Sequence, residues 1–103
     1  MMPDNQTICQ SVTIPLTTLL SSEWKQLKTY SRVVFITMGM KKPDETGYVS
    51  WSKIEIAAMA EIPMRSVDRG IQDLRSRQFL YIVEPGSRWR PDTLYEYEHH
   101  IYR

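Results

Sequence analysis

Apolar residues between positions 20 and 38 recur at the intervals that a helix needs to place them on one side. They lie mostly three, four or seven residues apart: Leu20, Trp24, Leu27, Val34 and Met38. The stretch 33–36 is rich in β-branched residues, but its continuity with the upstream stripe favours a helix over a strand. Ser21 or Ser22 can cap the start of this helix, and Gly39 ends it. The pattern therefore predicts one helix from residue 22 up to Gly39.

A capping box, Ser52-Lys-Ile-Glu55, marks the start of a second helix. The hydroxyl of Ser52 can accept a hydrogen bond from the amide of Glu55, whose side chain can reach back to the amide of Ser52. We expect this helix to run through Ala60, because the segment 61–63 ends in proline and breaks it.

A third helix is predicted over 64–77, because Val67, Ile71 and Leu74 are spaced by four and three residues and share one face. The other predicted elements are a helical turn over 16–20 and strands over 48–50, 79–83 and 93–97, the last two separated by a turn and a polar loop. This order of elements predicts an α+β domain over 13–98. A flexible N-terminal arm over 1–12 and a short C-terminal tail over 99–103 flank it.

The composition is that of one folded domain. The chain has 103 residues, of which 42% are hydrophobic and 24% are charged. Its one cysteine, Cys9, cannot form an internal disulfide, which fits a reducing cytoplasm. No apolar run approaches the roughly 18 residues of a membrane span, and the first residues show no secretion signal. We therefore expect a cytoplasmic protein without a membrane contact.

The sequence offers no converging set of nucleophile, base or metal ligands. His99 and His100 are adjacent near the C-terminus, but no further ligand stands at a suitable spacing, which favours a solvated tail over a metal site. No glycine-rich phosphate loop is present. We expect no enzyme activity, no metal, no cofactor and no small-molecule ligand.

The helices expected over 52–60 and 64–77 are joined by a tight turn. Such a turn makes two helices cross steeply, so the second projects as a rod of a size that fits the major groove of DNA. The small residues Ala57, Ala58 and Ala60 allow the close approach of the helices. Ile62 is expected to fill the gap beneath the turn.

This region resembles the winged helix-turn-helix domains of bacterial, phage and plasmid regulators and replication proteins, and the resemblance covers about residues 14–97. The positions that match the family pattern are Ile56, Ala57, Ile62, Ser66, Val67, Arg69, Ile71 and Leu74. Three positions depart from it. Glu61 and Gln78 stand where the family has glycine, and Pro63 stands where it has a capping serine or threonine.

The resemblance implies a winged helix-turn-helix fold, with a three-helix core, a short strand and a C-terminal β-hairpin wing. It also implies sequence-specific binding of double-stranded DNA, in transcriptional regulation or in phage or plasmid replication control. In this arrangement the third helix enters the major groove and the wing lies on the backbone.

With the apolar side of the third helix facing inward, its polar residues face sideways or outward. The candidates for DNA contact are Arg65, Ser66, Arg69, Gln72 and Arg75. Arginine can form two hydrogen bonds with guanine and glutamine can pair with adenine, whereas serine suits a phosphate. Each of these residues alone is equally well explained as a solvated surface residue, and only the cluster favours DNA.

The predicted hairpin tip carries Arg88, Trp89 and Arg90, which place two guanidinium groups around an aromatic ring. Such a wing can straddle phosphates or enter the minor groove, or Trp89 can fold back onto the hairpin. Between residues 63 and 90 there are six arginines against three acidic residues, in a chain whose net charge is +1. This local excess of positive charge favours a nucleic-acid-binding face. Asp68 and Asp73 would lower the affinity of that face for DNA, unless they pair with neighbouring arginines.

The alternative function is a protein–protein interaction module without DNA binding, because the fold alone does not fix the function. In that case the apolar patch would come from Trp24, Tyr30, Trp89 or the pair Tyr95 and Tyr97. The arginines of helix and wing together favour DNA. A homodimer is a further expectation, since one recognition helix reads few base pairs. Its candidate contact surfaces are the first helix and the segment 7–14, although Trp24 and Leu27 of that helix are equally well explained as core residues.

Overall fold

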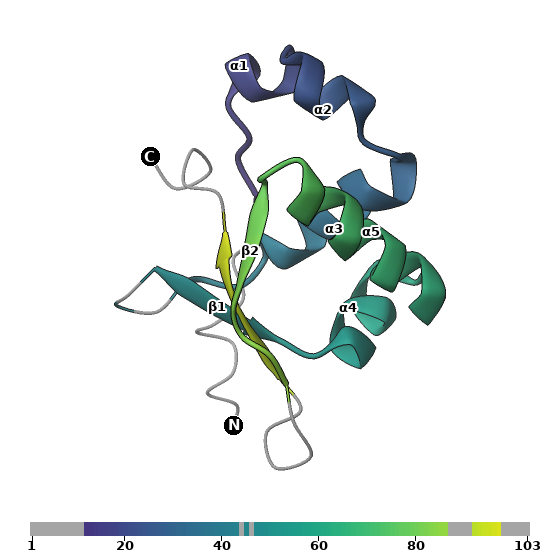
Figure 1. The fold of residues 1–103 in the computed structure, drawn as a ribbon, viewed down its shortest axis with the longest axis vertical. Helices are drawn as coiled ribbons and strands as arrows, with labels where there is room; N and C mark the ends of the chain where they lie inside the picture. The colour runs from purple at the N-terminus through teal and green to yellow at the C-terminus, as the bar shows by residue number, and fades with distance from the viewer. Residues whose placement is uncertain (1–11, 44, 46, 87–91, 98–103) are drawn as a thin grey trace.

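The structure is a computed structural model that describes residues 12–43, 45, 47–86 and 92–97. Within them the chain forms, in order, α1 (Leu16–Leu19), α2 (Ser22–Gln26), α3 (Thr29–Met38), β1 (Tyr48–Trp51), α4 (Lys53–Ala60), α5 (Met64–Ser76), β2 (Leu80–Glu84) and β3 (Thr93–Tyr97) (Figure 1). The predicted C-terminal tail lies outside the described residues, as does the predicted N-terminal arm apart from Val12. Except for the helix expected over 22–38, every predicted element is present, with its ends moved by one residue at most.

The single helix expected over 22–38 is wrong, because the chain forms α2 and α3 with an extended break between them. At this break Leu27 and Lys28 have ψ angles of 143° and 157°. The break buries the side chain of Leu27 in the core. It also brings the start of α3 to Asp73 of α5, whose carboxylate accepts hydrogen bonds from the Lys28 amide at 3.2 Å and from the Ser31 hydroxyl at 2.7 Å. Tertiary contacts thus outweigh the helical periodicity of the sequence.

Burial follows the predicted apolar stripes closely. The inward residues of α5 are buried as expected: Val67, Ile71 and Leu74. Four members of the upstream stripe are also buried: Trp24, Leu27, Val34 and Met38. Leu20 is an error of the prediction, because its side chain is 60% exposed. It forms the C-terminal cap of α1, which is a separate helix from α2 and so does not continue its stripe.

The three strands form one antiparallel sheet in the order β1-β3-β2. The strand β3 therefore pairs with both others, so that Glu96 lies opposite Tyr48 of β1 and opposite Tyr81 of β2. A bulge shifts the register between Ile82 and Glu84. Figure 1 shows α3, α4 and α5 gathered on one side of the sheet, with α1 and α2 beyond the end where β2 begins.

The core is centred on the packing of α3 against α5. Trp24, Phe35 and Phe79 pack edge to face, with ring centroids 5.4 to 6.1 Å apart. The two helices lie close together at Gly70, where an added Cβ atom would lie 2.9 Å from Cγ2 of Val34. Because the core is close-packed, only glycine fits this crossing without displacing a buried neighbour.

The start of α4 has the predicted capping box. The Glu55 amide donates to Oγ of Ser52 at 3.1 Å, and the Ser52 amide donates to Oε1 of Glu55 at 3.4 Å. Lys41 binds the same carboxylate oxygen at 2.9 Å, and its ammonium lies 4.3 Å from the ring centre of the buried Trp51. This end of α4 is therefore fixed to the α3–β1 connection and to the sheet.

The positions that depart from the family pattern adopt the backbone that the pattern requires. Glu61 ends α4 with a φ of 56°, and Gln78 follows α5 with a φ of 65°, both in the left-handed region that favours glycine. Pro63 is the N-cap of α5, and Ile62 packs against the core beneath the turn, as expected. The order of elements and the sheet confirm the α+β fold class, in a winged-helix-like arrangement. Within the described ranges no helix is long and apolar enough to cross a membrane.

Candidate nucleic-acid interface

The helix α5 has sharply different sides. Its buried residues are Val67, Gly70, Ile71 and Leu74. On the opposite side Arg65, Arg69 and Gln72 are exposed, and their spacing of four and three residues aligns them along the helix. We call Arg65, Arg69 and Gln72 the outer ridge.

The side chains of the outer ridge form no hydrogen bond or ion pair with any other described residue. Arg65 and Arg69 are one turn apart, so their guanidinium groups reach out from the same face. Each guanidinium presents planar donors that match phosphate oxygens or the acceptor edge of guanine, and the amide of Gln72 offers both donors and an acceptor. The ridge can therefore bind an anionic ligand with a hydrogen-bonding edge.

The flank of α5 that faces α2 and α3 is fixed by Asp73. In addition to the Lys28 amide and the Ser31 hydroxyl, its carboxylate accepts a hydrogen bond from Nε of Arg77 at 3.2 Å. Arg77 also donates to Oε1 of Gln26 at 2.6 Å. The pairing of Asp73 with an arginine on its own helix was one of the two alternatives that the sequence left open, whereas its bonds to α3 were not visible in the sequence.

These contacts show in the pKa of Asp73. Partial burial alone raises this pKa, but the hydrogen bonds from Ser31, from the Lys28 amide and from Arg77 outweigh burial and hold the pKa below its usual value of 3.8. Asp73 is therefore ionised and internally neutralised, and it does not add an unpaired negative charge to the outer ridge.

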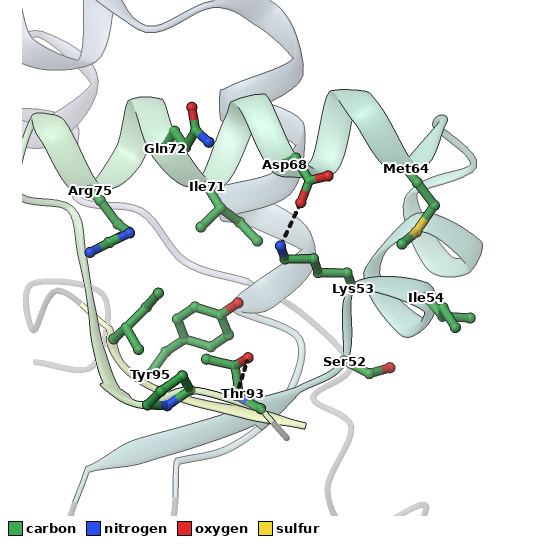
Figure 2. Close-up of a pocket in the computed structure, with 13 residues that line it drawn as sticks. Ser52, Lys53, Ile54, Met64, Asp68, Ile71, Gln72, Arg75, Thr93 and Tyr95 are labelled. Atoms are coloured by element: carbon green, nitrogen blue, oxygen red, sulfur yellow. Dashed lines mark hydrogen bonds and ion pairs between the residues drawn. The ribbon is translucent and has the colours of Figure 1, made fainter. Parts of the chain in front are cut away.

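The other flank of α5 faces the β2–β3 sheet across a cleft of about 540 Å³ (Figure 2). The buried phenol of Tyr95 lies in this cleft, and burial raises its pKa above the usual value of 10.0. Figure 2 shows Lys53 of α4 reaching across the cleft toward Asp68 of α5, with the ammonium 2.6 Å from Oδ1. Arg75 lies exposed at the same flank of α5, two turns beyond Asp68. Asp68 was expected either to lower the affinity for DNA or to pair with a neighbouring arginine, and its partner is instead a lysine on another helix.

The structure brings the predicted DNA-contact residues of α5 together on one helix but in different settings. Arg65, Arg69 and Gln72 form the outer ridge, and Arg75 lines the cleft. Ser66 is half-buried and lies seven residues before Asp73, on the side of the helix that faces α3. The predicted wing residues Arg88, Trp89 and Arg90 lie outside the described residues.

Sequence reasoning did not select Lys53 and Met64, which both line the cleft. The capping box places Lys53 at the first position of α4, but its pairing with a residue fifteen positions later depends on how α4 and α5 cross. Met64 is 43% exposed at the first position of α5. The spacing of apolar residues in the sequence does not show whether a methionine at this position is exposed or belongs to the core.

The prediction of an exposed aromatic patch for a protein-binding function is wrong for two of its residues. Trp24 and Tyr95 are 7% and 1% exposed and belong to the core. Tyr30 is half-buried. Trp89 and the side chain of Tyr97 lie outside what the structure describes.

The sequence favours a solvated tail over a metal site for His99 and His100. Both lie outside the described residues. In the part of the chain that the structure describes, no three His, Cys, Asp or Glu side chains gather at a distance that could hold a metal ion.

The sequence matches no protein-family model and no curated protein. Two solved structures have a similar fold. One, described as the N-terminal domain of a DNA binding protein, has a TM-score of 0.65 at 16% identity over 84% of this chain and 72% of that chain. The other, described as the structure of a Rep–DNA complex, has a TM-score of 0.64 at 16% identity over 86% and 75% of the two chains. At this identity the likeness shows a shared fold.

Proposed function

We propose that this protein binds double-stranded DNA in a sequence-specific manner, with α5 in the major groove. The observation that carries the proposal is the outer ridge. Arg65 and Arg69 are exposed without a partner among the described residues, while the two acidic residues of the same helix are engaged elsewhere. A helix with such a face complements the negative charge of DNA.

In the proposed complex the ridge residues meet base edges or the adjacent phosphates. Arg65 and Arg69 suit guanine, and Gln72 suits adenine. Arg75 and Ser66, at the two flanks of the helix, suit phosphates. We further propose that Arg88 and Arg90 of the wing bind phosphates of the DNA backbone.

The biological role that we propose is transcriptional regulation or control of phage or plasmid replication, without a catalytic step. Both similar structures are described as DNA-binding, and the Rep–DNA complex supports the replication role. The proposal includes a homodimer, because two recognition helices read a longer two-fold site. Leu16 and Leu20 of α1, 68% and 60% exposed, support a contact between copies at this helix. Sedimentation equilibrium of a Leu16→Gln/Leu20→Gln variant tests this contact, since loss of the dimer is expected.

The same exposed leucines also support the alternative function, a protein-binding module without DNA binding. Salt dependence separates the two. Binding to DNA weakens steeply as salt rises, because counterions must return to the phosphates. Capture of a protein partner by apolar residues is insensitive to salt.

The test is a fluorescence-anisotropy titration of a mixed duplex-DNA pool at two salt concentrations. The Arg65→Ala/Arg69→Ala variant is expected to lose most of the affinity and to keep the fold. Lys25→Ala/Lys42→Ala is the matched control, because it removes the same charge from exposed positions on α2 and on the α3–β1 connection. The proposal requires that the control binds nearly as the wild type does. Equal binding by both variants would contradict it.

A further inference from the structure

Asp68 is placed where a DNA-binding helix ordinarily avoids negative charge. It lies one turn from Gln72 of the outer ridge, on the side of α5 that borders the cleft (Figure 2). Its side chain is 44% exposed. In the proposed complex this carboxylate faces the DNA and repels any phosphate near it.

The pairing of Asp68 with Lys53 is a loose one. The two charged atoms are 2.6 Å apart but lack hydrogen-bond geometry, and Oδ1 of Asp68 has no hydrogen-bond partner among the described residues. The Lys53 side chain is 48% exposed. Oδ1 itself is buried, but both side chains are about half exposed, and pairs of this kind contribute little to stability, so exchanging the partners has a low cost.

In the proposed complex Lys53 leaves Asp68 and turns toward the DNA. It is the first residue of α4 and lines the cleft, and its flexible stem allows the ammonium to turn away from Asp68 (Figure 2). An ammonium in this position is attracted by a phosphate of the strand that borders the major groove. Asp68 then stands without its counter-ion.

A carboxylate at a base edge is selective because it only accepts hydrogen bonds. Guanine and thymine present acceptors in the major groove and repel it, whereas the N4 amino group of cytosine donates to it. Adenine also presents an amino group, but beside the acceptor N7. Cytosine is therefore the base that a lone aspartate favours.

We propose that Asp68 is a specificity-determining residue that selects cytosine, and that Lys53 is its counter-ion in the free protein and a phosphate ligand in the complex. This inference rests on the proposed DNA binding. It assigns opposite effects to the two residues: Asp68 lowers affinity for most sequences and raises selectivity, and Lys53 raises affinity for all sequences.

The test compares Asp68→Asn with the matched control Glu45→Gln, which removes the same charge from an exposed residue of the α3–β1 connection. Each protein is titrated with a random duplex pool, and the bound fraction is sequenced. For Asp68→Asn we expect affinity for the random pool to rise at least about twofold, because a charge that repels phosphates is removed. We also expect the preference for cytosine at one position of the selected site to fall at least about fivefold. Glu45→Gln is expected to change neither.

Lys53→Met provides the second arm. It is expected to weaken binding to the random pool and to reduce the slope of log affinity against log salt by about 1. Adding Asp68→Asn to it is expected to recover part of the lost affinity, because the uncompensated carboxylate is then removed. Circular dichroism verifies that each variant is folded.

Two negative outcomes differ in what they overturn. If Asp68→Asn and Glu45→Gln behave alike and select the same sequences as the wild type, Asp68 selects no base, and DNA binding by the outer ridge stands. If the wild type binds no duplex at low salt, the proposed function itself is wrong, and the inference fails with it.

Discussion

The two flanks of α5 each carry one aspartate, and the two are held in very different ways. Asp73 accepts three hydrogen bonds from two helices, and its side chain is 17% exposed. Asp68 has one ion pair without hydrogen-bond geometry and is 44% exposed. The flank with Asp73 fixes the helix to the fold, whereas the flank with Asp68 is able to exchange its partner. The same residue type on one helix thus has a structural role on one side and a proposed recognition role on the other.

The largest expected effect comes from disrupting the packing of α5 against α3 at Gly70. Gly70→Val adds a branched side chain where even a Cβ atom would be 2.9 Å from Cγ2 of Val34 and 3.4 Å from Cα of Ser31. Overpacking of a buried helix crossing costs about 3 kcal/mol of the free energy of unfolding. Urea denaturation measures it, with Gln72→Ala on the exposed side as a control that leaves stability nearly unchanged. An unchanged denaturation midpoint in Gly70→Val would show that α3 and α5 are not so close.

Removing the two aspartates separately compares the flanks directly. Asp73→Ala leaves the Lys28 amide and the Ser31 hydroxyl without their acceptor, and we expect a loss of about 2 kcal/mol of stability. Asp68→Ala breaks only an exposed ion pair, and the expected loss is about 0.5 kcal/mol. Thermal unfolding of both variants measures the difference. Equal losses would mean that the flanks do not differ as described.

A substitution at the end of α5 is expected to act on neither flank. Gln78 has a left-handed backbone, so Gln78→Gly relieves strain and is expected to raise the stability by about 1 kcal/mol. Affinity for DNA should stay the same, since Gln78 follows the helix and is not part of the outer ridge. Denaturation together with the anisotropy assay tests both statements, and a loss of stability would contradict the first.

The smallest expected effect is a pH dependence of the fixed flank. The pKa of Asp73 in the folded protein is below its usual value of 3.8. Its contribution to stability is therefore fully present well above the usual pKa, and it is lost as the pH falls through the lower pKa of the folded protein. The stability difference between the wild type and Asp73→Asn should therefore be larger at pH 7 than at pH 3. Urea denaturation at both pH values measures it. A difference that grows toward low pH would reverse the sign of the argument.

Local patterns predicted most of the elements because the forces that make them are local. The capping box of Ser52 and Glu55 and the apolar spacing on α5 each lie within one helix, and both are confirmed. The break at Leu27 was missed because it depends on Asp73, more than forty residues away. The partner of Asp68 was missed for the same reason, since Lys53 belongs to another helix. The exposed face of α5 and the pairing of Asp73 with Arg77 were predictable from the helical period, but the bonds of Asp73 to α3 and the lysine partner of Asp68 were not.

The order of the strands has a consequence for synthesis on the ribosome. β1 pairs with β3 alone, and Trp51 at its end lies opposite Thr93, so β1 has no strand partner until the chain has grown by a further forty-two residues. α3, α4 and α5 emerge earlier, and contacts among them are closer in sequence and faster to form. We therefore expect the helices to assemble first on the nascent chain, and the sheet to close last around β3.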